Sequence, residues 1–334
     1  MRRILPALLA ILIAACSELP DGPAETPALR IRALALADWT PNGYGTTTGL
    51  AQVDAIAATG ATHIVLVVTA YQSDAQSDRL TADPARTPSA SAIQAAAGRA
   101  RALGMGVGIK PHVDLEDGGW RGTITPRDAD AWFASYEAFV LPLADLAASL
   151  GADLFVVGTE LAGTLGHEAS WRSVIGEART RFPGELTYAA SWDEAGLVPF
   201  FDTLDYVGID FYGPVTYRDE PGRFEILKGW QPWLQRLEQL HGQTGRPVLI
   251  TEIGYRSIDG AGRRPYEFGT DRQLDPGEQS DLYWAALTAL GEKDWVAGVV
   301  WWNWLASGQG GVANDDYTPS GKPAEKELSD AWSR

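Results

Sequence analysis

Eight short, nearly continuous apolar runs recur along the chain, and they constrain its fold more than any other feature. Runs of this kind are typical of parallel strands that are buried on both faces. They lie at residues 29–39, 62–68, 106–113, 153–160, 186–191, 205–212, 247–254 and 296–304. Because helical stretches alternate with them, the sequence predicts an α/β protein formed by a single (β/α)8 TIM barrel domain.

The helical stretches are amphipathic. The clearest covers 130–151, where Trp132, Tyr136 and Phe139 recur at helical spacing. Others are expected at 89–103, 168–181, 223–241 and 277–291, and after Pro323. No G-x-G-x-x-G turn follows the first apolar run, which argues against an open dinucleotide-binding sheet.

The N-terminus has the pattern of a bacterial export signal. Two arginines precede the apolar run ILPALLAILIAA, which is too short to span a membrane and is followed by Cys16, the single cysteine. The sequence Ile13-Ala14-Ala15-Cys16 resembles a lipobox, in which the cysteine is lipidated after cleavage. A plain secretory signal in which the cysteine lies there by chance is the alternative.

These features divide the chain into three parts. We expect a signal peptide at 1–15, a lipidated Cys16 with a polar, proline-rich tether at 16–29, and a catalytic domain at 30–334. The mature protein would then be anchored by lipid to a membrane of the bacterial cell envelope, on its periplasmic or outer face. No disulfide is expected in the mature fold.

Composition limits the partners. The formal net charge of −16 argues against nucleic acid and against an anionic polymer, so a neutral or cationic substrate is left. The chain has 13 tryptophans, and some of them are expected to line a pocket for a ligand with apolar faces, such as a sugar ring. We expect a monomer.

Polar and aromatic side chains follow the predicted strands. In a TIM barrel the chemistry lies at the carboxyl ends of the strands, so residues there are functional candidates. They are Asp38, Trp39, Tyr71, Gln72, Lys110, His112, Asp114, Glu160, Trp192, Asp193, Asp210, Tyr212, Glu252 and the run Trp301 to Trp304.

Two glutamates stand out because a buried carboxylate is costly without a partner or a chemical role. Glu160 ends the fourth predicted strand and Glu252 lies near the end of the seventh, on facing arcs of the rim. Two carboxyl groups across a cleft are what glycoside hydrolysis requires: one protonates the leaving oxygen, and the other attacks the anomeric carbon or activates water. An ion pair with an Arg or Lys of the rim is the structural alternative for each glutamate alone.

Motifs at these strand ends resemble glycoside hydrolase family 113. They are KPHVDLEDGGWRG (110–122), GTEL (158–161), LTYAASWD (186–193), DYVGIDFYGP (205–214), TEIGYRS (251–257), WWNW (301–304) and GKPAE (321–325). The resemblance covers the chain from about residue 30 to the C-terminus. It implies a clan of retaining β-glycosidases with catalytic acids on strands four and seven, and endo-β-1,4-mannanase activity without a cofactor.

The resemblance also implies roles for individual residues. Glu160 would be the general acid/base and Glu252 the nucleophile, with Tyr212 reaching Glu252. Trp302 would be the platform under the sugar, or else Trp301, since strand alternation turns only one of them inward. The other expected cleft residues are Lys110, His112, Trp120, Arg121, Trp192, Asp193, Tyr255 and Arg256.

One position departs from the wider clan. Most members place Asn before the acid/base, where its amide contacts the sugar 2-hydroxyl, and this chain has Thr159. A hydroxyl cannot copy the donor and acceptor pair of an amide. The axial 2-hydroxyl of a mannoside is compatible with such a change.

The sequence has three alternative interpretations, of which the first is disfavoured. A metal-dependent hydrolase is disfavoured because the histidines, His63, His112, His167 and His241, include no H-x-H pair. A surface lipoprotein that binds glycans without cleaving them is the second. The third is hydrolysis of another β-glycan, such as glucan or xylan, or exo-acting mannoside hydrolysis.

Overall fold

The computed structural model describes residues 29–269 and 272–333 as a closed barrel of eight parallel strands. Cys16, the signal peptide and residues 16–28 of the predicted tether lie outside the described residues. The strands are β1 (Ile31–Ala37), β2 (His63–Gln72), β3 (Gly106–Leu115), β4 (Leu154–Thr159), β5 (Glu185–Ser191), β6 (Val207–Phe211), β7 (Val248–Ile253) and β8 (Val296–Leu305). Strand β1 pairs with both β2 and β8, which closes the barrel and confirms the predicted TIM fold.

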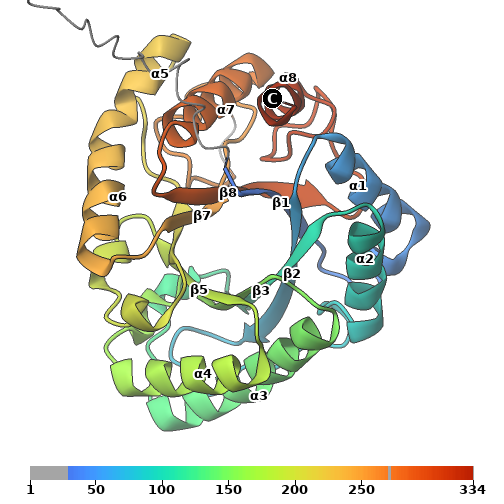
Figure 1. Cartoon of the computed structure of the whole chain (residues 1–334), viewed down its shortest axis with the longest axis vertical. Coiled ribbons are helices and arrows are strands. Elements are labelled where there is room, and N and C mark those ends of the chain that lie inside the picture. Colours follow the sequence, from blue (N-terminus) through green and yellow to red (C-terminus); the bar gives the residue numbers. More distant parts are fainter. Residues whose placement is uncertain (1–28, 270–271, 334) are drawn as a thin grey trace, which may run out of the picture.

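A ring of helices surrounds the barrel (Figure 1). The helices are α1 (Thr47–Ala58), α2 (Ala90–Ala102), α3 (Ala129–Ser149), α4 (Glu168–Arg181), α5 (Arg223–Gly229), α6 (Gln231–Thr244), α7 (Pro276–Gly291) and α8 (Pro323–Trp332). Sequence analysis did not predict α1, whose first turn is capped by the Thr46 side chain. The single helix predicted at 223–241 is two, α5 and α6, which meet at Trp230.

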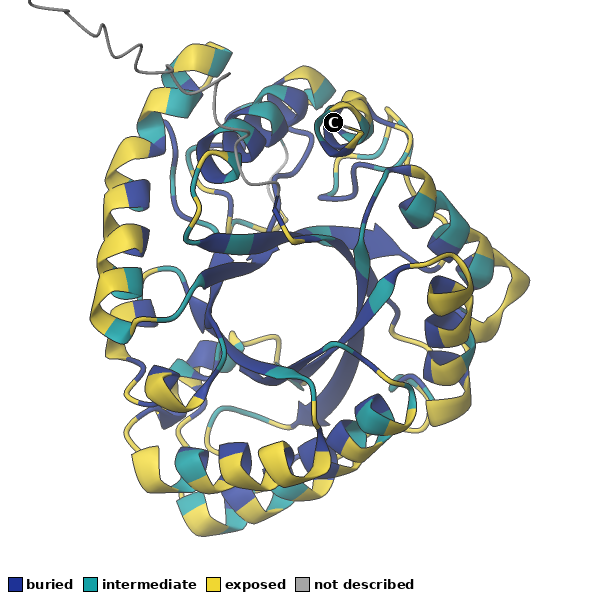
Figure 2. Ribbon diagram, in the orientation of Figure 1, coloured by how far each residue is buried: buried dark blue, intermediate teal, exposed yellow. Residues whose placement is uncertain are grey.

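The hydrophobic core has two layers. Small and branched side chains, among them Ala33, Ala35, Val65 and Val67, fill the barrel interior. A larger layer lies between the strands and the helices, whose inward faces are buried while their outward faces are exposed (Figure 2). The strands are therefore apolar on both faces, which is why they appear in the sequence as continuous apolar runs.

The loop between β7 and α7 is anchored at two points. The buried carboxylate of Glu278, on α7, accepts hydrogen bonds from the backbone N–H groups of Gly260 and Gly262, at 2.7 and 3.1 Å. The Tyr317 hydroxyl donates to the carbonyl oxygen of Pro265 at 2.6 Å. These contacts hold the loop segment that carries Tyr266 and Phe268 over the barrel. Among the described residues, no helix is both long and apolar enough to cross a membrane.

Candidate active site

A cleft of about 600 Å³ opens at the carboxyl ends of the strands. It is lined by His112, Trp120, Arg121, Glu160, Ser191, Trp192, Asp193, Tyr212, Glu252, Tyr266, Phe268 and Trp302. Both predicted catalytic glutamates and most of the predicted sugar contacts therefore face one cavity.

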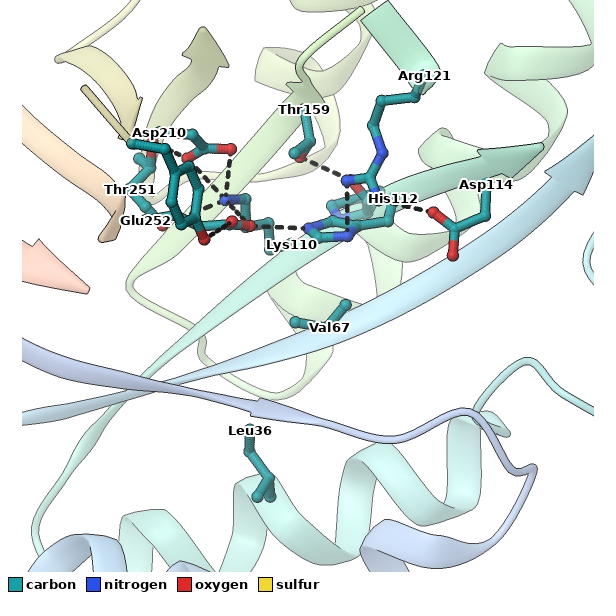
Figure 3. Close-up of polar contacts among 12 residues, drawn as sticks. Leu36, Val67, Lys110, His112, Asp114, Arg121, Thr159, Asp210, Thr251 and Glu252 are labelled. Atoms are coloured by element: carbon teal, nitrogen blue, oxygen red, sulfur yellow. Dashed lines mark hydrogen bonds and ion pairs between the residues drawn. The ribbon is translucent and has the colours of Figure 1, made fainter. Parts of the chain in front are cut away.

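Glu252 lies on β7 within a set of hydrogen-bond donors (Figure 3). Lys110 Nζ is 2.6 Å from Glu252 Oε1, and the Tyr212 hydroxyl donates to Oε2 at 2.9 Å. His112 Nε2 is 3.3 Å from Oε1. Burial by itself would raise the pKa of Glu252, but the charge of Lys110 and the contact with His112 outweigh it and hold this pKa well below its usual range. Glu252 is thus an anion in the resting site, as a nucleophile must be.

Lys110 is fully buried beneath this carboxylate rather than exposed in the cleft. Its Nζ contacts both carboxylate oxygens of Asp210, on β6, at 2.9 and 3.0 Å, and the Thr251 carbonyl at 3.2 Å. The Thr251 hydroxyl also donates to Asp210, at 2.7 Å. A buried charge needs this degree of pairing. Burial, followed by the charge of Glu252, raises the pKa of Asp210 despite the charge of Lys110. Lys110 therefore compensates Glu252 first, and Asp210 holds the lysine in place through hydrogen bonds.

Glu160 follows β4 with a backbone φ of 52°, in the left-handed region that residues other than glycine seldom occupy. Its backbone N–H donates to the Ala189 carbonyl at 2.8 Å, which keeps this conformation in place. Two residues earlier, Gly158 packs so closely on Trp171 and Tyr188 that a Cβ atom would lie 2.7 and 2.9 Å from their rings. The strand end is therefore shaped to direct the Glu160 side chain into the cleft.

The environment of Glu160 favours its protonated form. Burial raises the pKa of its carboxyl group; the charge of Arg121 opposes the rise, and the negative charge of Glu252 adds to it. The pKa of Glu160 is thus raised while that of Glu252 is lowered. Opposed shifts of this kind let one carboxyl group act as an acid and the other as a base or nucleophile at the same pH.

A further polar chain extends from Glu252 along β3. Arg121 Nη1 is 2.9 Å from His112 Nδ1, and Arg121 Nη2 donates to Asp114 Oδ1 at 2.6 Å. Trp302 stacks on the imidazole of His112, with ring centroids 5.7 Å apart and planes inclined by 17°. Trp302 therefore covers one face of the histidine and lines the cleft beside it.

The opposite wall is aromatic. Trp192 packs edge-on against Trp233, with ring centroids 5.3 Å apart. Tyr266 lies nearly parallel to Trp192, with ring centroids 6.3 Å apart. Tyr266 and Phe268 remain 48% and 76% exposed, so their rings are free to contact a ligand. Neither was predicted from the sequence, because only the folded path of the β7–α7 loop brings them to the cleft.

The sequence profile of Glycoside Hydrolase Family 113 matches residues 39–322. The chain belongs to this family. It is therefore a glycoside hydrolase, and the predicted family and enzyme class are confirmed. Among curated proteins, none matches the sequence significantly.

Solved structures show the same architecture. One described as a complex of a GH113 β-1,4-mannanase superposes with a TM-score of 0.84 at 24% identity, covering 92% of this chain and 99% of that one. The GH113 β-mannanase AaManA from Alicyclobacillus acidocaldarius, in complex with ManMIm, gives 0.83 at 25% identity, covering 92% and 97%. A β-glucuronidase from Faecalibacterium prausnitzii gives 0.60 at 14% identity, and there the match covers 49% of the larger chain.

Four sequence-predicted contacts of this glycoside hydrolase do not line the cleft. Trp301 is fully buried and stacks on Tyr283 of α7, with ring centroids 3.8 Å apart. Trp301 therefore faces the helices, and Trp302 faces the site. Tyr255 is also fully buried, beside Tyr283. Lys110 lies beneath Glu252, and Thr159, which is 1% exposed, donates its hydroxyl to the Pro111 carbonyl at 2.9 Å.

Arg256, the remaining predicted contact, also lies away from the cleft lining, where it pairs with Asp315 at 2.6 Å. Sequence analysis placed Asp114 and Asp210 at strand ends without giving them a role. The only signal for a role was their position near the carboxyl ends of β3 and β6.

Proposed function

We propose that this glycoside hydrolase cleaves β-1,4-linked mannan or manno-oligosaccharides with retention of anomeric configuration, by endo action. One observation carries the proposal: two glutamates share a single cleft, and their surroundings shift their pKa values in opposite directions. A double displacement needs this pair of states before substrate binds.

The mechanism assigns each glutamate two successive tasks. Glu252 attacks the anomeric carbon while Glu160 transfers its proton to the leaving glycosidic oxygen, which gives a glycosyl ester on Glu252 and a free alcohol. Glu160, now ionised, then takes a proton from a water molecule that attacks the same carbon, and Glu252 leaves as the carboxylate. A retaining pair implies carboxyl groups about 5–5.5 Å apart.

The cleft and the relatives support a neutral β-glycan as substrate. Aromatic rings of Trp120, Trp192, Tyr266 and Trp302 offer flat surfaces for sugar rings. The net charge of −16 disfavours an acidic polymer. The solved relatives named as β-mannanases make mannan the first candidate.

We also propose export and lipid anchoring through Cys16, on the strength of the N-terminal pattern. The test is metabolic labelling of the full chain with palmitate in a bacterial host. Label in the membrane fraction that disappears in Cys16→Ala supports the anchor, whereas a secreted, unlabelled protein would refute it.

The experiment for the activity compares the wild type with Glu252→Ala on mannan, xylan, β-glucan and a series of manno-oligosaccharides. We expect short manno-oligosaccharides from mannan with the wild type alone, and a first product of retained anomeric configuration by proton NMR. Faster cleavage of xylan or glucan would refute the substrate. Glycan binding without product from either protein would make the chain a binding lipoprotein instead.

A further inference from the structure

The hydroxyl group at C2 of the reacting sugar needs a hydrogen-bond partner in the site. Contacts to this group strengthen in the transition state of glycoside hydrolysis. Thr159 precedes the proposed acid/base but is turned away, because the residue is 1% exposed and its hydroxyl donates to the Pro111 carbonyl. Another group in the cleft must therefore serve the C2 hydroxyl.

His112 carries a donor whose direction is fixed by its neighbours. A guanidinium group has only N–H donors, so the 2.9 Å contact from Arg121 makes His112 Nδ1 the acceptor. Burial, followed by the charge of Arg121, lowers the pKa of His112 to about 4, so the imidazole is neutral near neutral pH. A neutral imidazole that accepts at Nδ1 carries its hydrogen on Nε2.

This Nε2–H group lacks a well-aligned partner among the described residues. It lies 3.3 Å from Glu252 Oε1, close enough to lower the pKa of that carboxyl group, but it is not aligned for a hydrogen bond to this oxygen and makes none to any other described atom. His112 is 3% exposed and lines the cleft, so the free donor is directed at a buried position beside the nucleophile. A buried donor without a partner is costly, and a substrate oxygen would satisfy it.

The contacts of Glu252 indicate where the sugar lies relative to this donor. Oε1 already accepts from Lys110 at 2.6 Å, whereas Oε2 accepts only from Tyr212 at 2.9 Å, so Oε2 is the oxygen better able to attack. When the anomeric carbon is at Oε2 and the ring is distorted from the chair toward the transition state, which turns the axial C2 hydroxyl outward, the space beside Oε1 at His112 Nε2 is the place for this hydroxyl. Trp302, stacked on the imidazole, holds the plane of the ring.

We propose that His112 donates its Nε2–H to the C2 hydroxyl of the sugar at the cleavage site, and that Arg121 and Asp114 are positioning residues that fix this tautomer. The inference rests on the proposed mannoside hydrolysis and names the residue that recognises the sugar at C2. Asp114 acts through Arg121, with its Oδ1 at 2.6 Å from Arg121 Nη2, and is not itself part of the cleft lining.

The test pairs protein variants with a substrate that lacks the hydroxyl. The substrates are 4-nitrophenyl β-mannobioside and its analogue without the C2 hydroxyl on the sugar that bears the nitrophenyl group. The intrinsic reactivity of the two substrates differs by the same factor for every enzyme, so the ratio of their kcat/KM values isolates the contact. We expect His112→Ala to change this ratio about 100-fold relative to the wild type, as for a lost hydrogen bond in a dry site.

Three further variants and a control separate recognition from a structural role. His112→Gln places an amide N–H group near the position of Nε2 and should restore part of the wild-type ratio, whereas His112→Asn should not. Asp114→Asn should shift the ratio in the same direction as His112→Ala but less. Glu116→Gln, which removes a partly exposed ion pair with Arg86 from the same loop, is the matched control and should leave the ratio unchanged.

The outcomes separate the two proposals. A wild type that cleaves neither mannoside refutes the proposed function. A wild type that cleaves the parent substrate, with the same substrate ratio in His112→Ala and His112→Gln as in the wild type, refutes the role of His112 alone. Circular dichroism of each variant shows that the fold is retained.

Discussion

Lys110 Nζ lies 2.6 Å from Glu252 Oε1 and 2.9 Å from Asp210 Oδ1, and no part of the lysine is exposed to solvent. One cation thus contacts two carboxyl groups on neighbouring strands, β7 and β6. The arrangement places a fixed positive charge under the proposed nucleophile, where it stabilises the anion before substrate arrives. Because Lys110 acts on Glu252 rather than on the substrate, its replacement should change the pH profile and the free energy of unfolding as well as the rate.

Replacing Lys110 by Met should lower kcat/KM by about 1,000-fold or more and raise the pKa of the acid limb of the pH profile, because Glu252 loses its main counter-charge. The same change leaves the buried Glu252 carboxylate without its counter-charge and takes from Asp210 its hydrogen bonds to the lysine, so the free energy of unfolding should fall by about 3–5 kcal/mol. Kinetics across pH and urea denaturation measure the two effects.

A second variant separates stability from catalysis. Adding Asp210→Asn to Lys110→Met replaces the ionisable group that has lost its lysine by a neutral amide, so stability should recover in part while the activity stays low. Full recovery of activity in the double variant would contradict the role given to the lysine.

Glu160 should govern the alkaline limb of the pH profile. Its pKa is raised mainly by burial, and the protonated form is the active one for glycosyl transfer, so the rate should fall as the pH rises through this pKa. In Glu160→Gln the alkaline limb should disappear and kcat/KM on mannan should fall by about 1,000-fold. A 2,4-dinitrophenyl mannoside, whose leaving group needs no proton, should still release dinitrophenol in a burst. An alkaline limb that persists unchanged in Glu160→Gln would assign it to another group.

Truncation of the two adjacent tryptophans of β8 should have different effects, one on activity and the other on stability. Trp302 lines the cleft, so Trp302→Ala should lower kcat/KM on mannan by about 100-fold with little change in stability. Trp301 is buried against Tyr283, so Trp301→Ala should lower the free energy of unfolding by about 3–5 kcal/mol. Measuring both quantities for both variants makes each the control for the other, and equal stability losses would contradict the assignment.

This pair of tryptophans also shows what could be read from the sequence. The eight strands were predictable because burial on both faces leaves continuous apolar runs, and Glu160 and Glu252 were predictable because acids break those runs at their ends. The direction of Trp301 and Trp302 was not, because strand alternation gives opposite faces without saying which is inward, and the register between β7 and β8 shifts nearby.

Side chains whose position depends on contacts with distant parts of the chain were predicted less well. Lys110 was expected in the cleft, but its depth depends on Asp210, a partner 100 residues away in the sequence. Tyr266 and Phe268 reach the cleft only because Glu278 and Tyr317 anchor their loop, and such contacts leave no local pattern.

Glu278 should make the stability of the enzyme depend on pH. Burial raises its pKa from an ordinary 4.5 to about 7, against the opposing hydrogen bonds from Gly262 and Gly260. Between these pH values the unfolded chain releases the proton while the folded protein keeps it, so the free energy of unfolding falls as pH rises, by up to about 3 kcal/mol. Below pH 4.5 both states are protonated, and this contribution is fully present. Urea denaturation at a series of pH values should therefore show a decline from pH 4.5 to 7 that is flattened in Glu278→Gln. The exposed Glu238→Gln on α6 should keep the wild-type slope, and a decline of equal size in Glu278→Gln would assign the pH dependence to other groups.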